Sequence, residues 1–208
     1  VKVLLLAPEH PLVDYHLAYL YHKLGEEEKS NFHLNRAENG SPFLVFPHRI
    51  TTLTCLEWAS KKIHSWKNNY YRALLYTHFG NKEKELQQLN GCDEADFAPL
   101  FVVRAKMKSG EERLQDLLTA EQLDPNDWRI GMELISFYQN ANKPEKALTY
   151  AEKHFNRDKS NDKIGLRYAK LLSVCGEYDK SLSLLSKLIV LPSEGASEGR
   201  VVYRQAHL

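Results

Sequence analysis

The sequence predicts an all-α protein, a right-handed superhelical array of antiparallel helix pairs, from three observations. The chain repeats itself with a fixed period, since Ile130, Gly131, Lys146 and Leu148 recur 34 residues later as Ile164, Gly165, Lys180 and Leu182. Each half of this repeat carries apolar residues at helical spacing. Hydrophobic residues make up 43% of the chain, enough for a core. A period of this length is typical of a helix–turn–helix unit, which must stack on its neighbours to bury both faces.

The helical pattern extends on both sides of this repeat. The first helices of successive units are predicted at 11–24, 66–79, 94–107, 128–141 and 162–175, and a last helix at 197–208. Second helices are predicted at 51–64, at 82–89 and around Leu114, Leu148 and Leu182. Residues 2–11 are interpreted as the end of another second helix, with a strand over 3–6 as the alternative, because short apolar runs fit both structures.

One stretch interrupts the pattern, a long irregular insertion at about residues 26–50. Its first part, GEEEKSNFHLNRAENGS, is polar and rich in turn-forming residues. Its last part, Pro42–Arg49, is apolar and bracketed by prolines, so we expect an extended segment packed on the array. Apart from this insertion, residues 1–208 are predicted to form one array without an internal domain boundary.

Composition and charge narrow the possible functions. A formal net charge of +1 gives no overall attraction to nucleic acid or membrane surfaces. No apolar run reaches the roughly 18 residues that a membrane-spanning helix needs. The three cysteines, Cys55, Cys92 and Cys175, are widely spaced and odd in number, which favours a reducing compartment such as the cytoplasm over a disulfide framework. Because the chain starts at Val1 and stops inside a predicted helix, we expect it to be part of a longer protein.

The chain carries no motif for catalysis or for a cofactor. There is no phosphate-binding loop, nucleophile elbow or dinucleotide fingerprint. The nine histidines are scattered without metal-ligand spacing, and Cys92 is interpreted as a turn cysteine. The sequence therefore predicts a protein that is not an enzyme and that has no cofactor or metal site.

The 34-residue columns resemble those of tetratricopeptide-repeat (TPR) proteins. A closer resemblance covers nearly the whole chain, through PLVDYHLAYLY (11–21), PFLVFPHR (42–49), LEWA (56–59), WKNNYYRALLY (66–76), DFAPLFVVRA (96–105), DLLTAEQLDPNDWR (116–129) and LPSEGASEGRVVY (191–203). This series is similar to a group of large, mostly bacterial proteins, many from Bacteroidetes. The resemblance implies a C-terminal TPR-type array behind an N-terminal mutarotase-like β-sandwich domain of unknown function, in a carbohydrate-related context.

The TPR resemblance also implies that the first helices line a concave groove. Counting from the unit starts places these basic and polar residues in it: Arg129, Gln139, Lys163, Arg167, Lys170, Arg200 and Arg204. Arg and Lys in such a groove hold carboxylates through charge-assisted hydrogen bonds. Lys163 and Arg167 match half of the pattern of TPR proteins that bind C-terminal carboxylates, whereas Glu133 and Ala98 depart from the other half. The alternative is that these charges are solvated or paired within the protein.

A second candidate is an aromatic patch made of Trp66, Tyr70 and Tyr71, beside the apolar part of the insertion. Either these rings belong to the core, or they form an aromatic platform for a peptide or sugar.

The sequence therefore predicts a non-catalytic interaction or scaffolding module. Its partner would be a protein or peptide, acidic or carboxylate-bearing in one version, or the parent protein's own N-terminal domain, held by the concave face. The alternative is a structural module packed on a carbohydrate-active or sugar-binding domain of the parent protein. Nucleic-acid and membrane partners are not expected.

Overall fold

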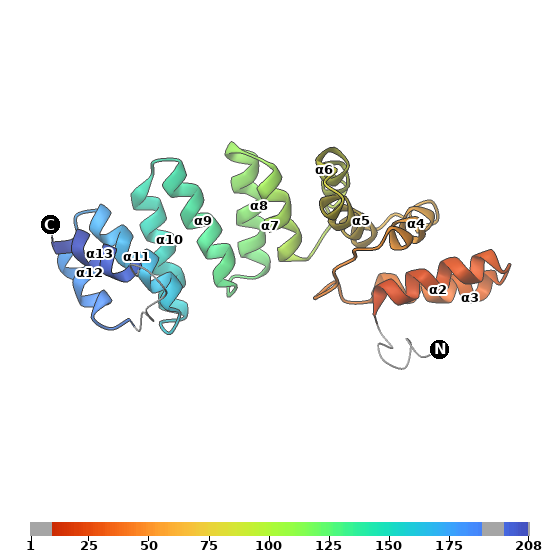
Figure 1. Ribbon diagram of the computed structural model, residues 1–208, viewed down its shortest axis with the longest axis horizontal. Helices are drawn as coiled ribbons and strands as arrows, with labels where there is room; N and C mark the ends of the chain where they lie inside the picture. The colour runs from red at the N-terminus through yellow and green to blue at the C-terminus, as the bar shows by residue number, and fades with distance from the viewer. Residues whose placement is uncertain (1–9, 189–197, 208) are drawn as a thin grey trace. The chain divides into compact units, whose positions relative to one another are not determined.

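The computed structural model describes residues 10–188 and 198–207, and these ranges contain twelve helices and no strand (Figure 1). The predicted all-α, helical-repeat fold class is therefore confirmed. The helices are α2 (Pro11–Lys23), α3 (Glu27–Asn39), α4 (Ile50–Ala59), α5 (Trp66–His78), α6 (Lys82–Asn90), α7 (Ala98–Met107), α8 (Gly110–Leu123), α9 (Trp128–Asn140), α10 (Pro144–Arg157), α11 (Asp162–Val174), α12 (Tyr178–Leu185) and α13 (Glu198–His207).

The helices group into two compact units, residues 1–100 and residues 101–208. In the first unit α2 and α3 form a hairpin, α4 contacts α2 and α5, and α5 pairs with α6. In the second unit α8 to α12 each contact the next helix along the chain, and α13 lies against α11 and α12. That both units form one continuous array stays a prediction.

The core of the second unit follows the 34-residue register. Its centre is a cluster of buried residues from α9, α10 and α11: Ile135, Tyr138, Ala147, Ala151, Ile164 and Leu171. Small residues let neighbouring helices approach, because a Cβ placed on Gly131 would lie 2.5 Å from the ring of His154, and one on Gly165 would lie 2.5 Å from Leu188. The hairpin turns close through left-handed backbone at Asn142 (φ 54°) and Gly176 (φ 82°).

The prediction of an irregular insertion at 26–50 is wrong over most of its length, because Glu27–Asn39 forms the helix α3. Its buried residues, Ser30, Leu34 and Ala37, are spaced four and three apart and face α2. Ser30 Oγ donates a hydrogen bond to the Ala18 carbonyl over 2.8 Å. Two of the three inward residues are small or polar. The sequence therefore shows no apolar stripe at helical spacing there, and the segment resembles a polar loop.

Only residues 40–49 are non-helical between α3 and α4, and the apolar segment there is packed at alternate positions. Val45 and Pro47 are buried, whereas Phe43, Leu44 and Phe46 are 66%, 69% and 69% exposed. Leu44 has a left-handed backbone with φ 59°. The expected packing of this segment therefore holds for one of its faces.

Several predicted boundaries need smaller corrections. Helix α7 begins at Ala98 rather than at 94, and α4 ends at Ala59 rather than at 64. In α13 the buried residues are Val202 and Ala206, while Tyr203 is 50% exposed. The predicted helix end at 2–11 lies almost wholly outside the described residues.

Candidate functional site

Two of the predicted groove residues, Arg129 and Lys163, lie in the first turns of α9 and α11, and a side chain caps the amino end of each helix. The Asp127 carboxylate accepts a hydrogen bond from the Arg129 backbone N–H over 2.9 Å. The Asn161 side chain accepts one from the Ile164 N–H over 3.2 Å. Such caps satisfy amide groups that the helix itself leaves unpaired. They therefore hold the first turns of both helices in place.

Trp128 brings two of the predicted residues together. The Lys163 ammonium lies 5.3 Å from the centre of the Trp128 ring, and the Arg129 guanidinium lies 5.4 Å from it. Arg129 also lies 3.6 Å from the Asp127 carboxylate. Each cation–π contact at an exposed site is worth about 0.5–1 kcal/mol. Side chains from the first turns of α9 and α11 thus meet, with two cations on one indole.

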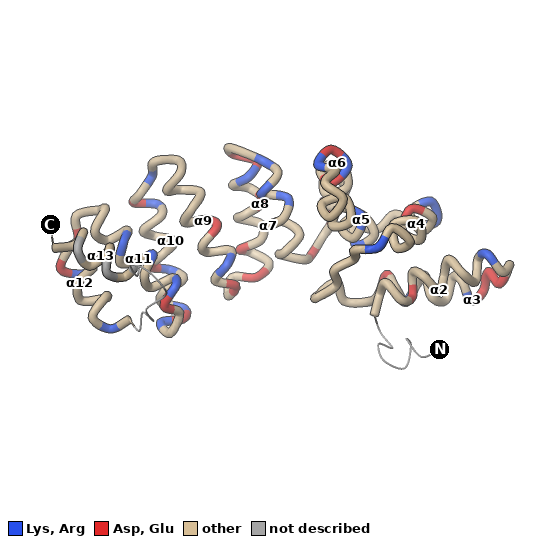
Figure 2. The backbone as a smooth tube through the Cα atoms, viewed as in Figure 1, with Lys and Arg blue, Asp and Glu red and all other residues tan. Residues whose placement is uncertain are grey.

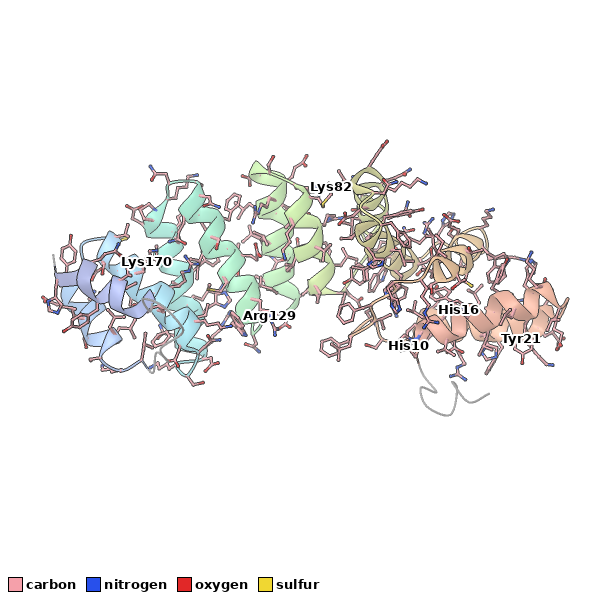
Figure 3. All side chains as sticks on the ribbon, viewed as in Figure 1. His10, His16, Tyr21, Lys82, Arg129 and Lys170 are labelled. Atoms are coloured by element: carbon pink, nitrogen blue, oxygen red, sulfur yellow. The ribbon has the colours of Figure 1, made fainter. Side chains whose placement is uncertain are left out.

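A basic stripe, defined as Lys163, Arg167 and Lys170, continues along α11. Lys163 is exposed, and the other two are half-buried. Neither Arg167 nor Lys170 has a hydrogen bond or ion pair to any residue in the part of the chain that the structure describes. Figure 3 shows Lys170 on α11 and Arg129 at the start of α9. The stripe therefore carries positive charge that its described neighbours do not neutralise.

Glu133 on α9, which is at the position equivalent to Arg167 one repeat earlier, already has basic partners. Its carboxylate lies 3.1 Å from Arg113 and 3.8 Å from Lys106. Gln139 lies at the carboxyl end of α9, ten residues after Arg129, and so lies away from Trp128. Arg200 and Arg204 belong to α13, but their side chains lie outside the described part of the chain.

The three residues of the predicted aromatic patch divide between core and surface. Tyr71 is fully buried and meets Tyr15 edge to face at 6.1 Å, and Tyr70 is 5% exposed. Burial raises the pKa of Tyr70 to about 12. Trp66 is half-buried and stacks on Phe97 at 6.3 Å. The two tyrosines follow the core alternative, and Trp66 is the member of the three that lines a cavity.

That cavity is a feature that the sequence reasoning missed. It has a volume of about 720 Å³ and is lined by Glu38, His64, Ser65, Trp66, Lys67, Asn69, Gly91, Asp93, Glu94 and Asp96. The acidic loop residues appear as the red stretch between α6 and α7 in Figure 2. The available signal was the run Asp93–Asp96 (DEAD) directly after the Asn90–Gly91 turn, which the helix pattern absorbed into α7.

One cysteine and one histidine meet in the first unit without forming a nucleophile. Cys55 Sγ lies 3.4 Å from His16 Nδ1, and His16 Nε2 lies 3.0 Å from the Thr52 hydroxyl. Burial raises the pKa of the Cys55 thiol to about 11, and burial followed by the nearby Arg49 lowers the pKa of His16. A thiol of that pKa stays protonated at neutral pH, so this pair is structural.

No three His, Cys, Asp or Glu side chains among the described residues gather closely enough to bind a metal ion together. None of the described helices combines the length and the apolar character that crossing a membrane requires.

The fold resembles that of solved TPR proteins. PilF of Pseudomonas aeruginosa superposes with a TM-score of 0.55 at 17% identity, covering 93% of this chain and 87% of that one. A thermophilic TPR protein of Thermus thermophilus gives a TM-score of 0.47 at 16% identity, covering 95% and 98%. The TPR2AB domain of yeast Sti1, in its pHSP90 complex, gives 0.41 at 13% identity, covering 94% and 97%.

No family model matches the chain, and no curated protein matches it. The similarity to PilF therefore defines a class of fold, a TPR-like helical-repeat protein, and does not extend to a binding partner.

Proposed function

We propose that this chain is a non-catalytic module that binds a protein or peptide partner along the face shared by α9 and α11. The observation that carries this proposal is the basic stripe, Lys163, Arg167 and Lys170, which has no acidic partner on the described residues at Arg167 and Lys170. A half-buried guanidinium is poorly solvated, so an incoming carboxylate loses less on binding to it than to a fully hydrated cation.

The spacing of the stripe suits an extended acidic segment. Lys163 and Arg167 are four residues apart on a helix, which is about 6 Å along its axis. Alternate residues of an extended peptide point to the same side about 6.6 Å apart. Two carboxylates at positions i and i+2 of a partner could therefore reach both cations at once. Trp128, with Lys163 and Arg129 beside it, offers an aromatic edge at one end of this track.

A peptide-display selection tests this function directly. The chain is immobilised and used to select from a random library, in parallel with Arg167→Glu and with Lys159→Glu as the matched control. Lys159 is an exposed lysine in the turn before α11, off the stripe. We expect acidic sequences to be enriched by the wild-type chain and by Lys159→Glu, and to be lost with Arg167→Glu. Enrichment of the same sequences by Arg167→Glu would reject the proposal.

A second candidate function is structural and rests on the first unit. Phe43, Leu44 and Phe46 stand exposed in the segment PFLVFPHR, one of those that carry the family resemblance, and Ile50 beside them is 62% exposed. Clustered exposed apolar residues are typical of surfaces that another domain covers. In this reading the segment contacts the parent protein's N-terminal, sugar-related β-sandwich domain, as the resemblance implies.

Hydrogen exchange separates the two candidates. The structural candidate predicts that residues 42–50 exchange more slowly when the chain is joined to the preceding domain of its parent than when it is alone. Equal exchange in both forms would count against it and would leave the peptide-binding candidate unaffected.

A further inference from the structure

The cavity beside Trp66 is built from three separate stretches of the first unit. Glu38 comes from the last turn of α3, His64 to Asn69 from the residues just before α5 and its first turn, and Gly91 to Asp96 from the loop after α6. Its volume of about 720 Å³ lies within the range of roughly 300–1,000 Å³ that is usual for ligand pockets. None of the predicted groove residues on α9 or α11 lines it, so it is distinct from the basic stripe.

Its walls are held by hydrogen bonds that leave little freedom. The Lys67 ammonium donates to the backbone carbonyls of Glu38 and Gly40 over 2.7 and 2.8 Å, which ties α5 to the end of α3. The Asn69 amide donates to the Gly91 carbonyl over 2.8 Å, which ties α5 to the acidic loop. Because these walls are already fixed, the protein loses less conformational entropy when a ligand binds.

Buried contacts support the same walls from behind. Cys92 is fully buried, and its thiol donates to the Trp66 carbonyl over 3.5 Å and to the Gln88 carbonyl over 3.3 Å. The Trp66 ring stacks on Phe97. Arg72 donates to the Asn69 side-chain oxygen over 2.7 Å, which fixes the orientation of that amide. The loop that carries the acidic residues is therefore anchored at both of its ends.

The charge of the lining is strongly unbalanced. Four carboxylates line the cavity, those of Glu38, Asp93, Glu94 and Asp96, against the one ammonium of Lys67. The amino end of α5 adds about half a positive charge. The sum is about −2.5 charges in a depression whose protein walls focus the field. Glu94 and Asp96 are exposed at this site, whereas the Glu38 carboxylate accepts a hydrogen bond from the Tyr15 hydroxyl.

We propose that this cavity binds the cationic side chain of a basic peptide segment, with an arginine or lysine head group beside Trp66, held by the carboxylates of Glu94 and Asp96. A planar guanidinium matches the oxygens of a carboxylate. Lys67 and Phe97 already lie against the Trp66 ring, so the attraction comes from the carboxylates. The site takes a ligand of the charge opposite to the one that the basic stripe attracts.

The test uses the full chain labelled with ¹⁵N, because its three indole N–H signals report on separate places. Trp58, Trp66 and Trp128 are assigned with the three Trp→Phe variants. The chain is titrated with the blocked tripeptide acetyl-Gly-Arg-Gly-amide, with its neutral citrulline counterpart and with calcium chloride. We expect the arginine peptide to shift the Trp66 indole and the Asn69 amide signals, and the citrulline peptide and calcium to leave them in place.

Charge-removing variants then locate the ligand. Glu94→Gln and Asp96→Asn should each weaken binding of the arginine peptide about threefold, as removal of an exposed ion pair does. Glu83→Gln, an exposed acid on α6 outside the cavity, is the matched control and should bind as the wild type does. Added sodium chloride should weaken the binding, because it screens these charges.

Absence of a Trp66 shift at millimolar arginine peptide would overturn the proposal. So would equal shifts with the citrulline peptide, which would indicate a neutral-peptide site, or a shift with calcium alone, which would indicate a metal site. An Arg167→Glu chain should bind the arginine peptide unchanged, so this result is separable from the fate of the peptide-display selection.

Discussion

The repeat region α9–α12 and the hairpin α2–α3 reach the same local shape by different chemistry. In α9–α12 the inward residues are apolar or very small, with the exception of His154, and the contact between helices depends on positions such as Gly131 and Gly165 that recur every 34 residues. In α2–α3 the interface contains Asp14, which is 2% exposed and lies 2.7 Å from His33 Nδ1 and 3.5 Å from Arg36.

This difference shows which kind of helical hairpin can be predicted from its sequence. Apolar packing leaves a periodic record, because each core position demands a residue of the same type in every unit. The polar contacts of Asp14 with His33 and Arg36 leave no such record, because each of these residues is individually typical of a solvated surface. The hairpin α2–α3 is therefore the region where mutation tests the difference most directly.

The largest effect is expected for Asp14→Ala. This change removes the buried acceptor that His33 and Arg36 share, which we expect to cost about 3 kcal/mol, since hydrogen bonds to charged groups contribute about 1.5–3 kcal/mol each. Hydrogen exchange of the α2 and α3 amides measures the loss locally, which matters because a chain of two units need not unfold in one step.

The matched control is Glu28→Ala, since Glu28 is an exposed acid on α3. It should change the same exchange rates little. If Asp14→Ala exchanged like Glu28→Ala, the polar contacts of Asp14 would contribute nothing to the stability of the hairpin. Apolar contacts at Tyr15, Ala18 and Leu34 would then hold it alone.

The next effect separates two equivalent glycines of the repeat. A Cβ on Gly131 would lie 2.5 Å from the Cγ atom of His154, close to the base of a buried side chain. We expect Gly131→Ala to cost about 2 kcal/mol, as overpacking of a core does. On Gly165 the nearest atom, at 2.5 Å, is the tip of Leu188, which can rotate away.

Gly165→Ala should therefore change the stability of the second unit by less than about 0.5 kcal/mol, because the gain in helix propensity of about 1 kcal/mol offsets the adjustment of Leu188. Urea unfolding of the two variants, followed by circular dichroism, gives the comparison. Equal losses for both would mean that the 34-residue register alone, and not the neighbouring side chain, sets the tolerance.

The same contrast explains which parts of the fold the sequence could predict. The bounds of α5, α9 and α11 agree with the prediction to within one residue at each end, because apolar spacing and the capping residues Ser65, Asp127 and Asn161 agree on where each helix starts. Helix α3 was missed because its inward residues, Ser30 and Ala37 among them, do not stand out by hydropathy.

The candidate sites show a similar limit. The convergence of Lys163 and Arg129 on Trp128 was foreseeable in part, because the repeat count places both cations at equivalent helix positions. The cavity beside Trp66 was not foreseeable, because it forms where Glu38, Asn69 and Asp96 meet from segments about 30 residues apart. No periodic signal connects residues that meet through loops.

A smaller effect than that of Gly131→Ala is expected at a polar contact between α8 and the repeat region, where the comparison predicts few. Glu121 on α8 is 7% exposed and accepts hydrogen bonds from His154 on α10 over 3.1 Å and from Lys153. Burial alone would raise the pKa of Glu121, but the hydrogen bonds from His154 and Lys153 and their charges outweigh it, so its pKa lies below the usual 4.5.

Because the carboxyl pKa of Glu121 is lower in the folded than in the unfolded chain, its contribution is present above about pH 4.5 and is lost as the pH falls through the folded value. Glu121→Gln should therefore lower stability by about 1 kcal/mol at neutral pH, with the gap to the wild type closing below that value. Urea unfolding at a series of pH values checks this, with the exposed pair of Lys180 and Glu177 removed by Glu177→Gln as the control. A difference in unfolding free energy that stayed constant through the acid range would mean that Glu121 acts by packing. Apolar packing would then account for the stability of the repeat region, as its sequence pattern indicates.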